Sequence, residues 1–321
     1  MLLYIMSRPH SGSTILDILL GNSAAVASIG QLISDMGKPH NPCACGETVG
    51  GCPFWRGVRA RVEAEGIAWD EAVRLSMGQG HVTRFPKTLM AGAGDAGLGR
   101  LATITHAIER AIVAESGKPV VCDSSKEPTR ALFLLKRYPD ARLIHLVRDP
   151  RGAIASHYWR LKDKGFYHFL RKDYRQPWLG PLFLALAAAS WSVGNALFEV
   201  GIRHDPKRVL RLRYEDLRDD PKGTLGRVGA FLGLALDDVA LKLDAGETLS
   251  AGHLIGGNDV RLEKGLRFDP VKETKRRRLP GWVEAMTVAF CWPLMRRYGY
   301  SIRRRSLHRT AAGAAGASGA S

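Results

Sequence analysis

The sequence predicts an α/β fold in which helices flank a parallel β-sheet. Three observations lead to this prediction: short apolar runs of strand length, polar residues directly after each run, and a helix-like pattern after those. The runs are residues 2–6, 120–122, 143–147 and 209–212. Because they are mostly apolar rather than strictly alternating, the sheet is expected to be buried on both faces, as parallel sheets are. Such sheets bind ligands at the carboxyl ends of their strands.

The composition is that of a globular protein with anionic partners. The chain has 321 residues, 45% of them hydrophobic and 24% charged, which is ordinary for a folded domain with a large core. The net charge of +16 is not ordinary. It indicates a partner such as a nucleotide, a nucleic acid or an anionic membrane face.

We predict one domain over residues 1–309, with a cysteine-containing insertion near residues 38–60. Residues 310–321 contain only Ala, Gly, Ser and Thr, so this low-complexity tail is expected to be disordered. Residues 92–99 are rich in glycine and predict a flexible connection before a helix over 101–116. The apolar run 179–190 is shorter than the roughly 18–20 residues of a membrane span. The first residues lack the features of a signal peptide, so a cytoplasmic location is expected.

The polar loop after the first strand is a candidate anion site. Ser11, Gly12, Ser13 and Thr14 lie between that strand and the helix pattern that begins at Ile15. Helix starts carry unpaired N–H groups and favour negative charge, glycine lets a ligand approach, and the hydroxyls add donors. A plain helix cap explains the same residues equally well. The glycine spacing and Gly-Lys pair of a Walker A loop are missing.

A second basic element follows the strand over residues 143–147. Arg148 stands at the carboxyl end of that strand, and Ser156 follows eight residues later in the next helix. A guanidinium with a nearby hydroxyl suits a second phosphate, because arginine pairs with phosphate oxygens. The alternative is a weak surface pair between Arg148 and Asp149.

Together the two elements resemble the superfamily of sulfotransferases that depend on 3′-phosphoadenosine 5′-phosphosulfate, in particular its bacterial and tyrosylprotein-sulfotransferase-like branch. Residues 8–14 look like its loop for the 5′-phosphosulfate, and residues 148–156 like its 3′-phosphate element. Three other segments agree in order: 121–126, 213–217, and 253–258 with Arg261. The resemblance implies a P-loop-like parallel sheet, this sulfonucleotide as donor, and no metal requirement for transfer to a hydroxyl or amine.

The resemblance also implies the site residues. The nucleotide is expected to contact Arg8, His10, Ser11, Gly12, Ser13, Thr14, Arg148, Ser156, Tyr214 and Arg261. His10 stands where relatives usually carry Lys or Arg, so Lys126 is expected to be the main cation at the sulfonate, with His10 assisting. Related enzymes place a Glu where this chain has Gln31, which cannot accept a proton usefully. Asp35, one helical turn further on, or His40 could serve as the base instead, or Gln31 could only orient the acceptor; Asp35 is the residue we assign.

A cysteine cluster remains outside this scheme. His40, Cys43, Cys45 and Cys52 are close enough in sequence to hold zinc, but the usual pair of C-x₂-C knuckles is absent. A Cys43–Cys52 or Cys45–Cys52 disulfide, or simple packing, explains the cluster as well. No metal ligand is assigned.

The carboxyl half bears on the acceptor. Residues 181–191 and 282–292 are apolar nearly all round and predict core helices. Basic residues cluster at 275–278, 296–297 and 303–305, which gives a solvated basic face or a peripheral contact with an anionic membrane. The acceptor is expected to be a small molecule, a carbohydrate or a lipid.

Two other classes of protein were weighed against the sulfotransferase. A P-loop kinase needs a Gly-Lys phosphate loop and carboxylates for magnesium, and the sequence offers neither. A basic nucleic-acid-binding protein would carry interleaved aromatic and basic residues or a helix-turn-helix signature. Because both signatures are missing, nucleic acid is not expected as a partner.

Overall fold

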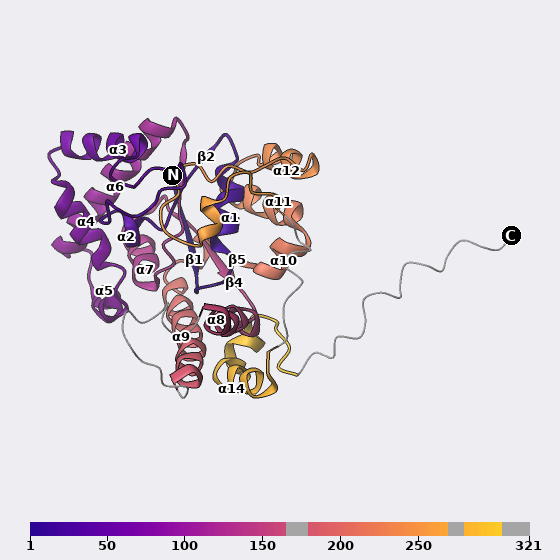
Figure 1. Cartoon of the computed structure of the whole chain (residues 1–321). Helices are drawn as coiled ribbons and strands as arrows, with labels where there is room; N and C mark the ends of the chain where they lie inside the picture. The colour runs from indigo at the N-terminus through magenta and orange to yellow at the C-terminus, as the bar shows by residue number, and fades with distance from the viewer. Residues whose placement is uncertain (165–178, 269–278, 304–321) are drawn as a thin grey trace.

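A computed structural model of the chain describes residues 1–164, 179–268 and 279–303. Five parallel strands form one sheet in the order β2-β3-β1-β4-β5, with helices on both of its faces (Figure 1). This confirms the predicted α/β class. The predicted tail 310–321 and the basic cluster 275–278 lie outside the described residues, as do residues 304 and 305.

The strands are β1 Leu2–Ser7, β2 Val26–Gly30, β3 Val120–Asp123, β4 Arg142–Val147 and β5 Val209–Arg213. Four of them extend the predicted runs by one residue at one end. The sequence reading missed β2, whose Ser and Gly residues dilute its apolar pattern. Central β1 pairs with β3 on one side and with β4 on the other, for example Leu3 with Cys122 and Arg142.

Alternate residues of β1 enter two different cores, which explains its unbroken apolar pattern. Leu2, Tyr4 and Met6 pack with α6 and α7, whereas Leu3 and Ile5 pack with α1 and α11 on the opposite face. Side chains alternate along a strand, so a strand covered on both faces needs apolar residues at every position.

The described residues form α-helices and short 3₁₀ turns along the whole chain. The α-helices are α1 Ser13–Gly21, α2 Leu32–Asp35, α3 Pro53–Ala64, α4 Trp69–Gly78, α5 Phe85–Met90, α6 Ala96–Ser116, α7 Pro128–Arg137, α8 Pro150–Lys164, α9 Leu179–Ile202, α10 Tyr214–Asp219, α11 Pro221–Leu232, α12 Asp237–Asp244 and α14 Gly281–Arg297. The 3₁₀ turns are η1 Val82–Arg84, η3 Pro206–Arg208 and η4 Asp259–Leu262.

Helix α6 begins earlier than predicted. Its first residue is Ala96, so part of the glycine-rich segment 92–99 is helical rather than a flexible connection. The reason is Asp95, whose carboxylate accepts a hydrogen bond of 2.8 Å from the Leu98 N–H and caps the helix.

Helices α9 and α14 are more exposed than predicted. On α9, Leu182, Leu186 and Val193 are 49%, 60% and 57% exposed, and on α14 Trp282 and Trp292 are about half exposed. Both helices bury one side in a third core that they share with α8. Helix α9 continues beyond the apolar segment 179–190. Among the described residues, one helix, Gly180–Ile202, is long and apolar enough to cross a bilayer. Only 33% of its most apolar window is buried.

Candidate active site

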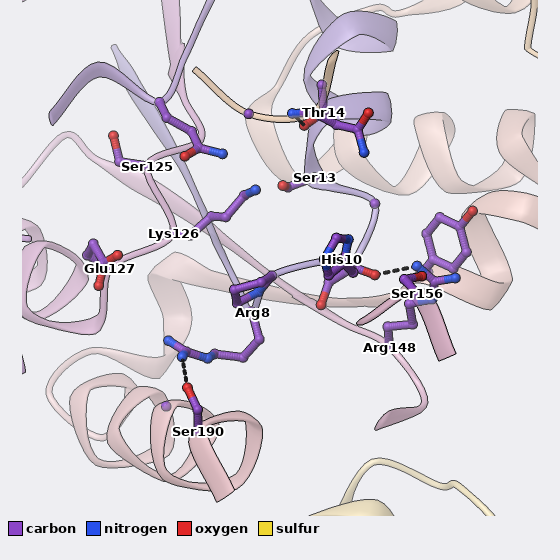
Figure 2. A pocket seen from close by; sticks show the side chains of 18 of the residues that line it. Arg8, His10, Ser13, Thr14, Ser125, Lys126, Glu127, Arg148, Ser156 and Ser190 are labelled. Carbon is purple, nitrogen blue, oxygen red and sulfur yellow. Dashed lines mark hydrogen bonds between the residues drawn. The ribbon is translucent and has the colours of Figure 1, made fainter. Parts of the chain in front are cut away.

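All five strands end at one edge of the sheet, and polar residues gather there. A cavity of about 990 Å³ opens at this edge. Among its lining residues are Arg8 after β1, Gln31 after β2, Lys126 after β3, Arg148 after β4 and Tyr214 after β5. The close-up in Figure 2 shows Lys126 and Glu127 on one side of the first loop, with Arg148 and Ser156 on the other. The cavity lies where ligands of open α/β sheets bind.

Gly12 is required for the shape of the first loop. Its φ of +84° is left-handed, and an added Cβ would lie 2.2 Å from Cδ2 of Tyr214. The Tyr214 ring therefore packs directly against the loop backbone, and only glycine leaves room for it. Gly12 is also the N-cap of α1, where its carbonyl accepts from the Leu16 N–H at 3.1 Å.

The hydroxyls of this loop do not cap α1. Helix α1 has no side-chain cap, and the buried hydroxyls of Ser11 and Ser13 find no hydrogen-bond partner within the described ranges. Both residues line the cavity. Buried hydroxyls that have no partner, at the start of a helix without a side-chain cap, are arranged as in an anion-binding site. The arrangement favours the anion interpretation over the plain cap.

Arg148 defines the far end of the cavity. Its Nη1 donates to the His10 carbonyl, and its guanidinium lies over the Tyr214 ring, 4.3 Å from the ring centroid. Ser156 lies beside it on α8, and Arg160 also lines the cavity one turn further along the helix. Two guanidinium groups and a hydroxyl at one end suit a phosphate dianion.

Lys126 is placed by a rigid turn after β3. Asp123 is fully buried; its carboxylate accepts from the Ser125 N–H at 2.9 Å and from Arg130 Nε at 2.9 Å. The chain then reaches Lys126 with a φ of +74°. Burial is the main cause that lowers the pKa of Lys126 to about 8, so the ammonium is still largely protonated at neutral pH.

Gln31 contacts this ammonium. With the Gln31 amide oriented so that its oxygen faces both donors, the oxygen accepts from Lys126 Nζ at 2.7 Å and from the Gly257 N–H at 3.3 Å. An amide holds the lysine without adding a negative charge. Gln31 thus positions Lys126 and the loop over residues 253–258, the late loop, at the same time.

His10 is neutral in the folded protein. Burial is the largest cause that lowers its pKa to about 3, and the neighbouring His157, Arg160, Arg148 and Lys126 lower it further. Its imidazole can donate one hydrogen bond, but it cannot supply the positive charge that a Lys or Arg would. Lys126 is therefore the cation at this part of the cavity.

Arg8 and Glu127 form the side of the cavity below Lys126. Arg8 donates to the Ser190 hydroxyl of α9 at 2.5 Å (Figure 2). It passes close to Gly194, where an added Cβ would lie 2.5 Å from the Arg8 Nε. Glu127 also lines the cavity, and burial raises the pKa of its carboxyl, while Arg8 and Lys126 oppose that shift.

The late loop closes the cavity beside Thr14. The Asn258 N–H donates to Thr14 Oγ1 at 3.3 Å, and both Gly257 and Asn258 line the cavity. Arg261 is not among the described lining residues. Its buried side chain turns toward the insertion, where Nη2 donates to the Pro42 carbonyl at 3.2 Å.

Most of the predicted site residues meet in this one cavity. The described lining includes Arg8, His10, Ser11, Gly12, Ser13, Thr14, Lys126, Arg148, Ser156 and Tyr214. It does not include Asp35, which is buried and accepts a hydrogen bond of 2.5 Å from Asn41 Nδ2. It does not include His40, which is exposed.

Sequence reasoning missed several polar lining residues, among them Glu127, Arg160 and Ser190, and a local signal existed for the first two. Glu127 directly follows Lys126, and Arg160 is four residues from Ser156 on the same helix face. Ser190 had no signal, because α9 reaches Arg8 only through the tertiary fold.

The chain was compared with known proteins. A family model described as "Sulfotransferase family" matches residues 3–238. Omega-hydroxy-beta-dihydromenaquinone-9 sulfotransferase Stf3 of Mycobacterium bovis is 33% identical over 117 residues, which is 36% of this chain and 29% of that protein; the same values hold for Stf3 of Mycobacterium tuberculosis. The match thus spans under a third of these relatives' length.

The fold has a solved counterpart in the sulfotransferase domain of the Synechococcus PCC 7002 olefin synthase. The two chains are 19% identical, with a TM-score of 0.50 over 94% of each chain, a likeness of fold. The family model covers well over half of the sequence. The chain belongs to the sulfotransferase family.

Proposed function

We propose that the protein transfers a sulfuryl group from 3′-phosphoadenosine 5′-phosphosulfate to the hydroxyl of a lipid-linked acceptor. The observation that carries the proposal is the cavity at the sheet edge, which has groups for anions at the start of α1 and at Arg148, and a half-buried lysine on the other side of the first loop from Arg148. Membership of the sulfotransferase family supports the same donor.

The two ends suit the two anionic parts of this donor. The start of α1, with the partnerless hydroxyls of Ser11 and Ser13, suits the 5′-phosphosulfate. Arg148, Ser156 and Arg160 suit the 3′-phosphate. The loop backbone connects both ends, because the His10 carbonyl accepts from Arg148.

In the proposed reaction, an oxygen of the acceptor forms a bond with the sulfur while the bond between the sulfur and the bridging phosphate oxygen breaks. Negative charge then develops on the bridging oxygen. The Lys126 ammonium and the N–H groups at the start of α1 stabilise this charge, in a site where burial strengthens the interaction. His10, being neutral, contributes a hydrogen bond at most.

We propose Glu127 as the base that takes the proton of the acceptor hydroxyl. Its carboxyl lines the cavity on the same side as Lys126, and its raised pKa makes it a stronger base than an exposed glutamate. Asp35 was the candidate from sequence, but its carboxylate is engaged by Asn41 outside the described lining. The proposal therefore moves the base from Asp35 to Glu127.

A stripe on α9 supports a lipid acceptor. Leu182, Leu186, Ser190 and Val193 follow one another at spacings of four, four and three residues and share one helix face. The two leucines are exposed, whereas Ser190 and Val193 line the cavity. This helix face, apolar except for Ser190, thus runs from the exposed leucines to the site. The curated relatives in mycobacteria are named for a menaquinone derivative, which is a lipid.

The test has two parts. Calorimetry with 3′-phosphoadenosine 5′-phosphate measures donor-site binding, and transfer of labelled sulfur to a polyisoprenoid alcohol in vesicles measures activity. We expect both the binding and the transfer, and we expect that ATP does not compete with the bisphosphate for the site. Failure to bind the bisphosphate would overturn the donor assignment. Binding without transfer to the vesicle alcohol, together with transfer to a water-soluble phenol, would overturn the lipid acceptor alone.

A further inference from the structure

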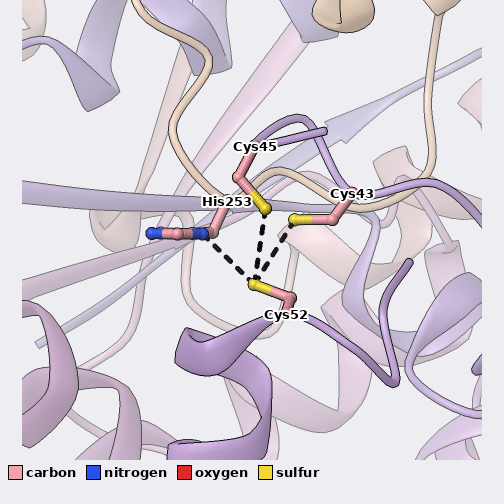
Figure 3. A group of neighbouring side chains, drawn as sticks. All are labelled: Cys43, Cys45, Cys52 and His253. Carbon is pink, nitrogen blue, oxygen red and sulfur yellow. Dashed lines mark hydrogen bonds between the residues drawn. The ribbon is translucent and has the colours of Figure 1, made fainter. Parts of the chain in front are cut away.

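Three cysteines and a histidine, none of them in the nucleotide loop, lie close together. Cys43, Cys45 and Cys52 come from the insertion, and His253 comes from the late loop (Figure 3). Cys52 Sγ lies 3.8 Å from Cys43 Sγ, 3.6 Å from Cys45 Sγ and 3.3 Å from His253 Nδ1. All four ligand atoms lie within 4.8 Å of one another. His40, the histidine weighed from the sequence, is exposed and does not belong to this group.

The three separations from Cys52 match three edges of a tetrahedral zinc site. Zinc–sulfur bonds of about 2.3 Å place two thiolates about 3.8 Å apart, and a zinc–nitrogen bond of about 2.0–2.1 Å places sulfur and nitrogen about 3.5 Å apart. The cysteines are free thiols, with sulfurs well beyond the roughly 2.05 Å of a disulfide. We propose that Cys43, Cys45, Cys52 and His253 bind one structural zinc ion.

The backbone around the thiols holds them in place before any ion arrives. Gly46 has a φ of +100°, and its N–H donates to the Cys43 carbonyl at 3.1 Å, which turns the chain tightly around Cys45. Cys52 is the N-cap of α3, so the start of that helix fixes its position. Cys45 is exposed and gives the ion a route from solvent, whereas Cys43 and Cys52 are buried.

The imidazole is oriented by contacts outside the ligand set. The His253 carbonyl accepts from Trp55 Nε1 at 3.0 Å, and the ring stacks on Phe54 with centroids 4.7 Å apart and an interplanar angle of 4°. Nδ1 thereby faces the three sulfurs. Such outer partners fix ring orientation in protein zinc sites.

The proposed ion would join the insertion to the late loop. The same two segments are also connected by a hydrogen bond of 3.0 Å from the Ala44 N–H to the Leu254 carbonyl. A few residues further on, Gly257 and Asn258 line the nucleotide cavity. Four protein ligands leave no open position for a substrate, and none of the four lines that cavity. The zinc is therefore structural and holds the late loop over the donor site.

The first experiment measures metal content. The intact chain, purified under reducing conditions without a histidine tag, is analysed by plasma mass spectrometry and expected to carry one zinc per chain. Cys52→Ser and His253→Phe, which keeps the stack on Phe54, are expected to lower zinc affinity at least about 10–100-fold. Cys291→Ala is the matched control, because this buried cysteine lies in the α9–α14 core, and it should retain zinc.

A second measurement on the unmodified chain covers the case in which the variants do not fold. Cobalt substituted for zinc should give the intense visible bands of a tetrahedral thiolate site. Removing the metal with a chelator should weaken binding of 3′-phosphoadenosine 5′-phosphate on the order of tenfold, because the late loop loses its anchor.

A chain that takes up neither zinc nor cobalt, or whose mass shows a disulfide, would overturn the proposal. So would zinc that persists in both ligand variants. Nucleotide binding by a metal-free chain would leave the sulfotransferase assignment intact, so the two proposals fail separately.

Discussion

The Tyr214 ring lies between Gly12 and the guanidinium of Arg148. One face of the ring carries the guanidinium at 4.3 Å, and the ring edge leaves no room for a side chain at Gly12. The two ends of the proposed nucleotide site are therefore coupled through one aromatic side chain. A change at either end should be felt at the other.

Replacing Arg148 should weaken nucleotide binding. In Arg148→Ala the 3′-phosphate loses a charged hydrogen-bond donor, and charged hydrogen bonds contribute about 1.5–3 kcal/mol, so affinity for 3′-phosphoadenosine 5′-phosphate should fall about 10–100-fold by calorimetry. Arg142→Ala, at the opposite end of β4, is the control and should bind normally. Equal affinities for the two variants would remove Arg148 from the site.

Gly12→Ala should damage both stability and binding. The new Cβ would collide with Tyr214 and force a left-handed φ on a non-glycine residue, at a cost of about 1–3 kcal/mol in the free energy of unfolding. Urea denaturation and calorimetry measure the two effects. Gly99→Ala in α6 meets no atom within 4 Å and should be neutral or slightly stabilising. A Gly12→Ala protein as stable as the parent would contradict the packing described.

Glu127→Gln should slow transfer while leaving nucleotide affinity nearly unchanged. Loss of a general base lowers kcat about 10²–10⁴-fold, and the acid limb of the pH–rate profile should disappear with it. That limb should lie above the ordinary glutamate range, because burial raises the pKa of Glu127. Asp35→Asn is the comparison and should keep the limb. If Asp35→Asn removes it instead, the base assignment reverts to Asp35.

Lys126 should set the alkaline limit of activity. Its pKa is lowered to about 8, so the cation is lost, and the rate falls, as pH rises through that value. Lys126→Arg should abolish this limb, because arginine does not titrate in the accessible range. Gln31→Glu places a carboxylate beside the ammonium, which raises the pKa of Lys126 and should move the limb to higher pH. A limb that stays near 8 in both variants would belong to another group.

The α9 stripe should matter only for an acceptor held in a membrane. Leu186→Ser removes an exposed apolar side chain; because burying a leucine contributes about 1.5–3 kcal/mol, turnover with a vesicle-bound alcohol should fall about tenfold. Calorimetry with the bisphosphate should show no change. Leu241→Ser on α12, where Leu241 is 68% exposed against 60% for Leu186, is the control. Equal losses in both variants would argue against a specific path along α9.

The sequence was most informative where local pattern and chemistry coincide. The apolar runs predicted the parallel sheet, and the residues after β1 and β4 predicted two sides of the cavity, because strand ends in such a sheet share an edge. The reading failed where partners are distant. His253 is 201 residues from Cys52, and no spacing rule connects them. Asp35, the base predicted from spacing, lies outside the described lining and accepts from Asn41 six residues away, so its place as base stays a prediction to be tested against Glu127.

The position of β1 has a consequence for how the chain is made. Leu2 pairs with Val121, and Leu3 also pairs with Arg142, so both neighbours of this strand are translated long after it. Until then its bare edges and two apolar faces resemble an aggregation-prone segment. During synthesis β1 therefore stays unpaired until β3 and β4 have also been made.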